Sequence, residues 1–350
     1  MTMENKEIEK LVRKNVLELS PYSSARDEYS DGGDMVFLDA NENPYDTGFN
    51  RYPDPHQKEI KKLIAKRQKI DLENIILGNG SDEVIDLLFK TFCDPGKDNI
   101  IILPPTYGMY QVSAGIHNVE VRQVELKSDF QPNIDAILKA VDANTKLLFL
   151  CSPNNPTGNL VEKKAIVELA EKFKGIIVID EAYIDFTEED SNIDLLGLFP
   201  RVFVMQTFSK SWGLAGIRLG VGFAHKTIIE MMNKVKPPYN ISKQTQNIAL
   251  LALTRADSGQ ELIKGIQQHK KEVIEALRKC NLVVKIYPSD ANFLLVKFKD
   301  APQMYKYLIK QGIVVRDRSK MPLCDNCLRI TIGTSEENDR LIDALNYLEK

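Results

Sequence analysis

Short runs of apolar residues alternate with longer amphipathic stretches between about residues 71 and 225, and this alternation restricts the fold more than any other feature. Strands that are apolar on both faces are buried between two layers of helices, as in a mostly parallel sheet. Their alternation with helices therefore predicts an α/β domain. The expected strands are Ile75–Leu77, Ile100–Leu103, Leu147–Leu150, Ile176–Ile179, Val202–Met205 and Leu219–Phe223, and the helices between them include Ser81–Phe92, Thr106–Ile116 and Glu162–Phe173.

The pattern changes after Pro238, and from there the sequence predicts a smaller α+β domain. A long helix rich in Lys, Glu and Gln is expected over about 258–280. The elements after it do not alternate regularly: strands are expected at Val283–Tyr287, Asn292–Phe298, Ile313–Arg316 and Leu328–Ile332, and helices at Gln303–Gln311 and Glu336–Leu348. Residues 1–20 predict an amphipathic helix with Ile8, Leu11, Val12 and Val16 on its apolar face.

Charge and composition exclude several classes of function. The net charge of −3, with both signs interspersed, gives no broad basic field, so we expect no nucleic-acid partner. The longest apolar run, Ile248–Leu253, is far shorter than the ~20 residues that cross a bilayer. An N-terminus without an apolar signal core and an odd number of cysteines, five, indicate a cytoplasmic location. Cys324 and Cys327 lack a second Cys or His pair nearby, so we expect buried thiols and no metal site.

Polar residues follow several expected strands at their carboxyl ends, where ligands bind in such sheets. We expect Ser81 to be the N-cap of the next helix, and the start of that helix can bind an anion through its backbone N–H groups. A capped helix that binds no ligand is the commoner interpretation of such a sequence. Asn155 stands in a loop with two prolines, which is either a binding loop or a structural turn. Asp180 ends a buried strand and needs a cation or several donors, and Tyr183 is near enough to share its cleft.

Lys210 directly follows another expected strand and stands among hydroxyl-bearing and small residues. Burial there would lower the pKa of its amine, as an amine that forms a Schiff base requires. Arg218 comes 8 residues later, beyond a Gly-rich bend. It can return to the same anion as Thr207 and Ser209.

The motifs at these strand ends resemble those of the fold type I pyridoxal-phosphate-dependent aminotransferases, class II. NNPTG (154–158), DEAY (180–183) and SKSWGLAGIRLG (209–220) occur in that order, and the resemblance extends over essentially the whole chain. Further segments narrow it to the histidinol-phosphate aminotransferase family: LDANENPY, NRYPDPHQ, GNGSDEVI, PPTYGMY, VIDEAYIDF and CLRITIG. The resemblance implies a large cofactor-binding domain over 31–255, with a mostly parallel mixed sheet between helix layers, a small domain over 256–350, and an N-terminal arm over 1–30 that joins the small domain.

The resemblance also implies a role for each candidate on the cofactor side. Lys210 would form the Schiff base with pyridoxal 5′-phosphate and later move the substrate proton, while Asp180 would pair with the pyridine nitrogen. Tyr183 and Asn155 would bind the phenolic oxygen, and Tyr107 would stack on the ring. The cofactor phosphate would be held by Gly80, Ser81, Asp82, Thr207, Ser209 and Arg218.

On the substrate side, the resemblance implies that Arg316 and Arg329 hold a phosphate or carboxylate. Alternation along Leu328–Ile332 places Arg329 on the face opposite its apolar neighbours. For Arg316, a surface salt bridge with Asp317 or a nearby Glu is an alternative. The same end would be lined by Tyr22, Asn41, Tyr52 and Asn155, with Tyr52 contributed by the second subunit of a homodimer.

The implied reaction is ping-pong transamination of histidinol phosphate, a phosphorylated amino alcohol, with 2-oxoglutarate, a 2-oxo acid. Its products would be imidazole-acetol phosphate and glutamate, in histidine biosynthesis. A related enzyme that acts on aromatic amino acids and a phosphothreonine decarboxylase are the alternatives, because the motifs bind the cofactor rather than the substrate.

Overall fold

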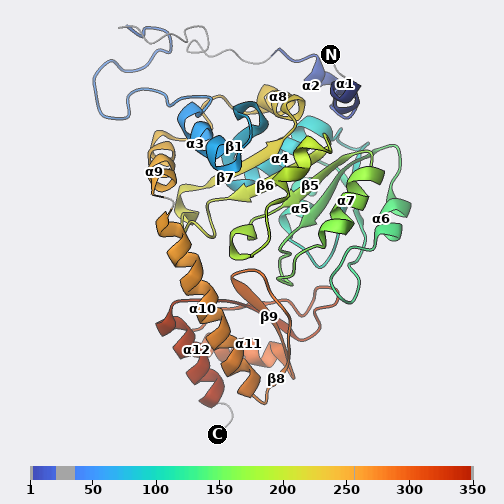
Figure 1. Ribbon diagram of the computed structural model, residues 1–350, viewed down its shortest axis with the longest axis vertical. Coiled ribbons are helices and arrows are strands. Elements are labelled where there is room, and N and C mark those ends of the chain that lie inside the picture. The colour runs from blue at the N-terminus through green and yellow to red at the C-terminus, as the bar shows by residue number, and fades with distance from the viewer. Residues whose placement is uncertain (1–2, 21–35, 256, 348–350) are drawn as a thin grey trace.

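The computed structural model describes residues 3–20, 36–255 and 257–347, which form a larger sheet, a smaller sheet and the helices around them (Figure 1). Within these residues the larger sheet has seven strands in the order β1-β7-β6-β5-β4-β2-β3. Strands β2 to β6 pair in parallel, and only β7 is antiparallel to its neighbours β1 and β6, so the predicted mostly parallel sheet is confirmed. The strands are β1 (Ile75–Asn79), β2 (Asn99–Ile102), β3 (Glu120–Gln123), β4 (Thr145–Cys151), β5 (Ile176–Asp180), β6 (Val202–Thr207) and β7 (Leu219–Ala224).

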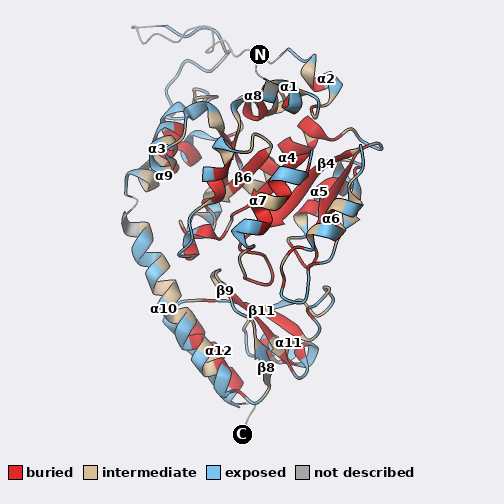
Figure 2. Ribbon diagram, turned by 45° about the vertical axis from the view of Figure 1, so that its right-hand side comes forward, coloured by how far each residue is buried: buried red, intermediate tan, exposed pale blue. Residues whose placement is uncertain are grey.

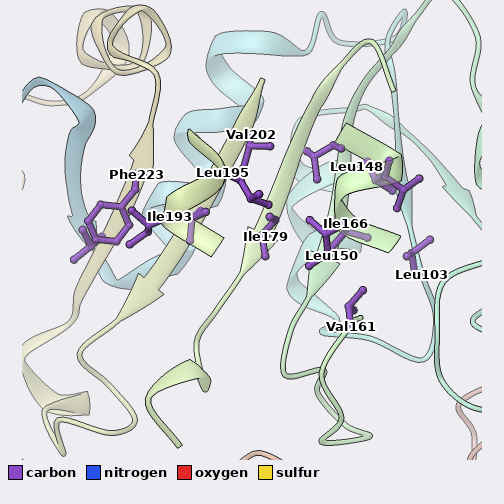
Figure 3. Close-up of a cluster of buried hydrophobic side chains, with 14 of the residues drawn as sticks. Leu103, Leu148, Leu150, Val161, Ile166, Ile179, Ile193, Leu195, Val202 and Phe223 are labelled. Carbon is purple, nitrogen blue, oxygen red and sulfur yellow. The ribbon is translucent and has the colours of Figure 1, made fainter. Parts of the chain in front are cut away.

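Both faces of this sheet are buried, as the apolar runs predicted (Figure 2). Along β5, Ile177 and Ile179 enter one hydrophobic cluster and Ile176 and Val178 enter another on the opposite face. Figure 3 shows the first cluster, in which Ile166 of a covering helix lies beside Leu150 of β4, and Phe223 of β7 lies beside Ile193 at the other end. The helices of this part are α3 (Lys58–Gln68), α4 (Gly80–Phe92), α5 (Met109–Ile116), α6 (Ile134–Ala140), α7 (Lys163–Lys172), α8 (Lys226–Val235) and α9 (Lys243–Thr254).

The smaller sheet is antiparallel, with the order β10-β11-β9-β8. One of its faces packs on helices around a separate apolar cluster, which leaves the other face free to approach the larger sheet. Its elements are α10 (Asp257–Lys279), β8 (Val283–Ile286), β9 (Phe293–Phe298), α11 (Ala301–Lys310), β10 (Arg316–Asp317), β11 (Cys327–Thr331) and α12 (Ser335–Tyr347). No helix in the described ranges is both long and apolar enough to cross a bilayer.

The N-terminal segment departs from the sequence prediction in two ways. Residues 3–17 form two short helices, α1 (Met3–Glu9) and α2 (Lys14–Leu17), rather than one helix, and Arg13 between them donates to Asp94 and to the carbonyl of Lys90. The resemblance implies an N-terminal arm that joins the small domain, whereas the described part of this arm packs on α4 and α8 of the larger part. The boundaries at 30/31 and 255/256 fall at residues outside the description and stay predictions.

Candidate active site

A cavity of about 560 Å³ lies where the parallel strands of the larger sheet end and the smaller sheet faces them. It brings together candidates that are far apart in the sequence: Ser81, Asp82, Tyr107, Asn155, Asp180, Tyr183, Thr207, Ser209, Lys210, Arg218, Arg316 and Arg329. Asn41 and Tyr52 do not line the cavity, and Tyr22 lies outside the described residues. Tyr52 is 48% exposed and stacks on Tyr239, with ring centroids 4.4 Å apart.

The start of α4 forms one end of the cavity, although not through the predicted cap. The N-cap is Asn79, whose N–H donates to Glu83 Oε2 at 2.6 Å, so the prediction that Ser81 caps the helix is wrong. Ser81 lies instead in the first turn, where free backbone N–H groups and the helix dipole favour an anion. Gly80 has φ +73° and approaches Arg218 so closely that a Cβ would lie 2.6 Å from Nη2.

Arg218 faces this helix start from the beginning of β7. Its Nη1 lies 3.4 Å from Ser209 Oγ, and its Nη2 lies 3.3 Å from Asp82 Oδ2. The Tyr107 hydroxyl donates to the other oxygen of Asp82 at 3.3 Å. A guanidinium, a hydroxyl and a helix N-terminus therefore meet in a geometry suited to a phosphate group.

Asp180 lies at the floor of the cavity and is only 3% exposed. Burial raises the pKa of its carboxyl to about 6. Two hydrogen bonds favour the carboxylate and oppose this rise: Tyr110 Oη donates at 2.6 Å and the Ala182 N–H donates at 3.1 Å. No Lys or Arg of the described chain forms an ion pair with it. The sequence prediction missed Tyr110, because it lies 70 residues before Asp180 in the chain and no local signal marks the contact.

Lys210 connects the two ends of the cavity. Partial desolvation lowers the pKa of its amine, and the positive charges of Arg329 and Arg218 lower it further. Its Nζ lies 5.7 Å from the centre of the Tyr183 ring. Asn155 then links Tyr183 to the smaller sheet, because its Nδ2 donates to the Tyr183 hydroxyl at 3.4 Å and its Oδ1 accepts from Arg329 Nη1 at 2.6 Å.

Arg316 and Arg329 are paired across β10 and β11, directly opposite each other. Leu328 and Ile330 are buried in the small-domain cluster while Arg329 lines the cavity, so the predicted alternation is confirmed. Arg316 forms no salt bridge within the described residues, and Asp317 accepts the N–H of Ser319 at 2.8 Å. Cys324 and Cys327 are buried free thiols, and no group of three or more potential metal ligands occurs in the described ranges.

Comparison with known proteins gives a consistent result over nearly the whole chain. The profile of the family described as aminotransferase class I and II matches residues 32–345. The histidinol-phosphate aminotransferase of Christiangramia forsetii is 53% identical over 348 residues, which cover 99% of this chain and 99% of that protein.

Solved structures agree in fold. The crystal structure of the histidinol-phosphate aminotransferase from Clostridium acetobutylicum gives a TM-score of 0.79 at 27% identity, covering 86% of this chain and 91% of that one. The crystal structure of the Sinorhizobium meliloti histidinol-phosphate aminotransferase in complex with pyridoxal-5′-phosphate gives a TM-score of 0.77 at 22% identity, covering 85% of this chain and 84% of that one.

Proposed function

The chain belongs to the aminotransferase class I and II family, and from this premise we propose that it transfers an amino group between histidinol phosphate and 2-oxoglutarate with pyridoxal 5′-phosphate as cofactor. The products are imidazole-acetol phosphate and glutamate. One observation carries the proposal: a single cavity holds the amine of Lys210 between an anion-binding helix start and the arginine pair of the smaller sheet. A transaminase that acts on a phosphorylated substrate needs one anion site for its cofactor and another for its substrate.

Three properties of the cavity fit pyridoxal phosphate. The start of α4, with Ser209 and Arg218, supplies donors for the cofactor phosphate. Asp180 is a buried carboxylate without a cationic partner among the described residues, and a protonated ring nitrogen would supply that cation. A volume of about 560 Å³ lies within the usual range for small-molecule sites, about 300–1,000 Å³.

The chain's own groups provide the acid–base chemistry. When bound, the cofactor supplies a carbonyl carbon for the amino group and a ring that accepts electrons. A lowered pKa keeps more of the Lys210 amine neutral, so its Nζ can act as a nucleophile and would carry a proton between the amine-bearing substrate carbon and the cofactor carbon that supplies the carbonyl. Asn155 and Tyr183 orient the reacting groups, and Arg316 and Arg329 bind the distal anion of either substrate.

The test is glutamate formation by the cofactor-loaded protein from histidinol phosphate and 2-oxoglutarate. We expect turnover, and we expect Lys210→Ala to abolish it while the fold remains. No turnover, or release of CO₂ from phosphothreonine in its place, would overturn the proposal.

The proposal includes a homodimer in which Tyr52 reaches the partner's cavity. It is supported by exposed apolar side chains on the segment before α3, which a partner would cover: Val36 (84%), Leu38 (87%), Tyr45 (79%) and Phe49 (59%). Mixing Tyr52→Ala with Lys210→Ala protein tests it, because one site of a mixed dimer keeps both native residues. We expect the mixture to recover activity that neither variant has alone, and no recovery would count against a shared site.

The proposal also places the protein in the cytoplasm, because Cys93, Cys151, Cys324 and Cys327 are buried free thiols, as suits a reducing compartment. We also propose the domain division at about residues 31 and 256; the two separate sheets support the boundary at 256.

A further inference from the structure

A third arginine, Arg318, lines the cavity beside Arg316 and Arg329. Its backbone N–H donates to the carbonyl of Cys327 at 2.9 Å, which continues the pairing of β10 with β11 beyond the two residues of β10. Arg318 stands two residues after Arg316 and therefore shares its face of the sheet. Three guanidinium groups thus enter the cavity from two adjacent strands.

The positive charge of this arginine cluster (Arg316, Arg318 and Arg329) is not balanced within the described part of the chain. None of the three forms an ion pair there, and Asp317 points to the other face and accepts the N–H of Ser319. The acids that line the cavity, Asp82 and Asp180, belong to α4 and β5 on the cofactor side.

The arginine cluster is also incompletely hydrogen-bonded. The Nε atoms of Arg318 and Arg329 are buried and find no acceptor among the described residues. Burial and the charge of Arg316 lower the pKa of Arg318. Buried donors without acceptors are costly, so the cluster is stabilised by an anion that brings several oxygens.

We propose that Arg318 makes this end of the cavity selective for phosphate monoesters over carboxylates, an inference that rests on the proposed function and deepens it. A phosphate monoester carries about −1.5 to −2 charges at neutral pH and three terminal oxygens, whereas a carboxylate carries one charge and two oxygens. Arg316 and Arg329 can already satisfy a carboxylate through bidentate contacts. A third guanidinium therefore gains most from the additional oxygen and charge of a phosphate.

The experiment measures binding to the cofactor-loaded protein by calorimetry, with methyl phosphate and glutarate as probes. In Arg318→Gln we expect the Kd of methyl phosphate to rise about tenfold or more and that of glutarate to rise less than about threefold. Arg318→Met repeats the test should the Gln variant be unstable. Lys320→Gln is the matched control, because Lys320 is an exposed cation of the same segment that does not line the cavity, and we expect both Kd values to stay unchanged.

Selectivity distinguishes this role from a structural one. Equal weakening of both probes, or no weakening of methyl phosphate, would overturn the inference. If methyl phosphate binding depends on Arg318 as expected but histidinol phosphate is not turned over, the proposed function fails and the selectivity assignment stands.

Discussion

Replacing Asp180 with asparagine tests how strongly the fold disfavours the buried carboxylate in the cofactor-free protein. Burial raises the pKa of Asp180 from 3.8 to about 6. The folded state therefore holds this proton more tightly than the unfolded state, and folding stability falls as the pH rises from about 4 to about 6. At about 1.4 kcal/mol per pKa unit, the ionised carboxylate costs about 3 kcal/mol above that range.

Urea unfolding of the cofactor-free wild type and Asp180→Asn measures this cost. The variant does not titrate at this position, so its stability relative to the wild type should increase with pH. From the two pKa values, about half of the 3 kcal/mol develops between about pH 5 and about pH 8.

The cofactor should reverse the effect. A cationic ring nitrogen beside Asp180 favours the carboxylate, so adding pyridoxal phosphate should remove this pH dependence in the wild type. The cofactor should leave the pH dependence of the variant unchanged, because the variant has no carboxyl at this position. A stability difference that does not change with pH, or that decreases as the pH rises, would refute the reasoning.

Three further substitutions follow from the same geometry. Tyr110→Phe removes the donor at 2.6 Å from Asp180 Oδ2, so the pKa of Asp180 should rise further, seen as an upward shift in the same pH series; an unchanged midpoint would contradict this. Arg329→Ala should raise the KM of both substrates about tenfold to a hundredfold with a smaller change in kcat, and unaltered kinetics would remove Arg329 from the anion site. Gly220→Ala should destabilise the protein by about 1–3 kcal/mol and weaken cofactor binding, because a Cβ there would overlap the backbone of Gly80 and Ser81; Gly115→Ala, where a Cβ meets nothing within 4 Å, is the control, and equal behaviour of the two variants would contradict the argument.

The sequence predicts the larger sheet well because its central strands are buried on both faces. The runs that become β4, β5 and β6 contain no polar interruption, which leaves few alternatives to a buried strand. The hydrophobic pattern of the edge strands is weaker. The sequence of β3 is Glu-Val-Arg-Gln, and this strand was not predicted. Of the predicted strand Ile313–Arg316, only Arg316 lies in β10.

Local pattern also decides which parts of the site were found. Asp180 is the last residue of β5, Lys210 stands three residues after β6, and Arg218 directly precedes the antiparallel β7. Their sequence positions therefore predict their place at the same edge of the sheet. Tyr110 was missed because it reaches Asp180 across 70 residues, a contact that no local pattern encodes. Arg318 was missed because alternating Arg and Asp residues are typical of a strand that is exposed to solvent. Only the pairing of β10 with β11 shows that one face of this segment lies towards the cavity.

Borohydride reduction of the protein loaded with pyridoxal phosphate, followed by peptide mass spectrometry, tests the central claim most directly. The reagent fixes the cofactor to whichever amine holds it. The account predicts a pyridoxyl group on Lys210, whose amine lines the cavity and has a lowered pKa. A pyridoxyl group on another lysine, or on none, would contradict it.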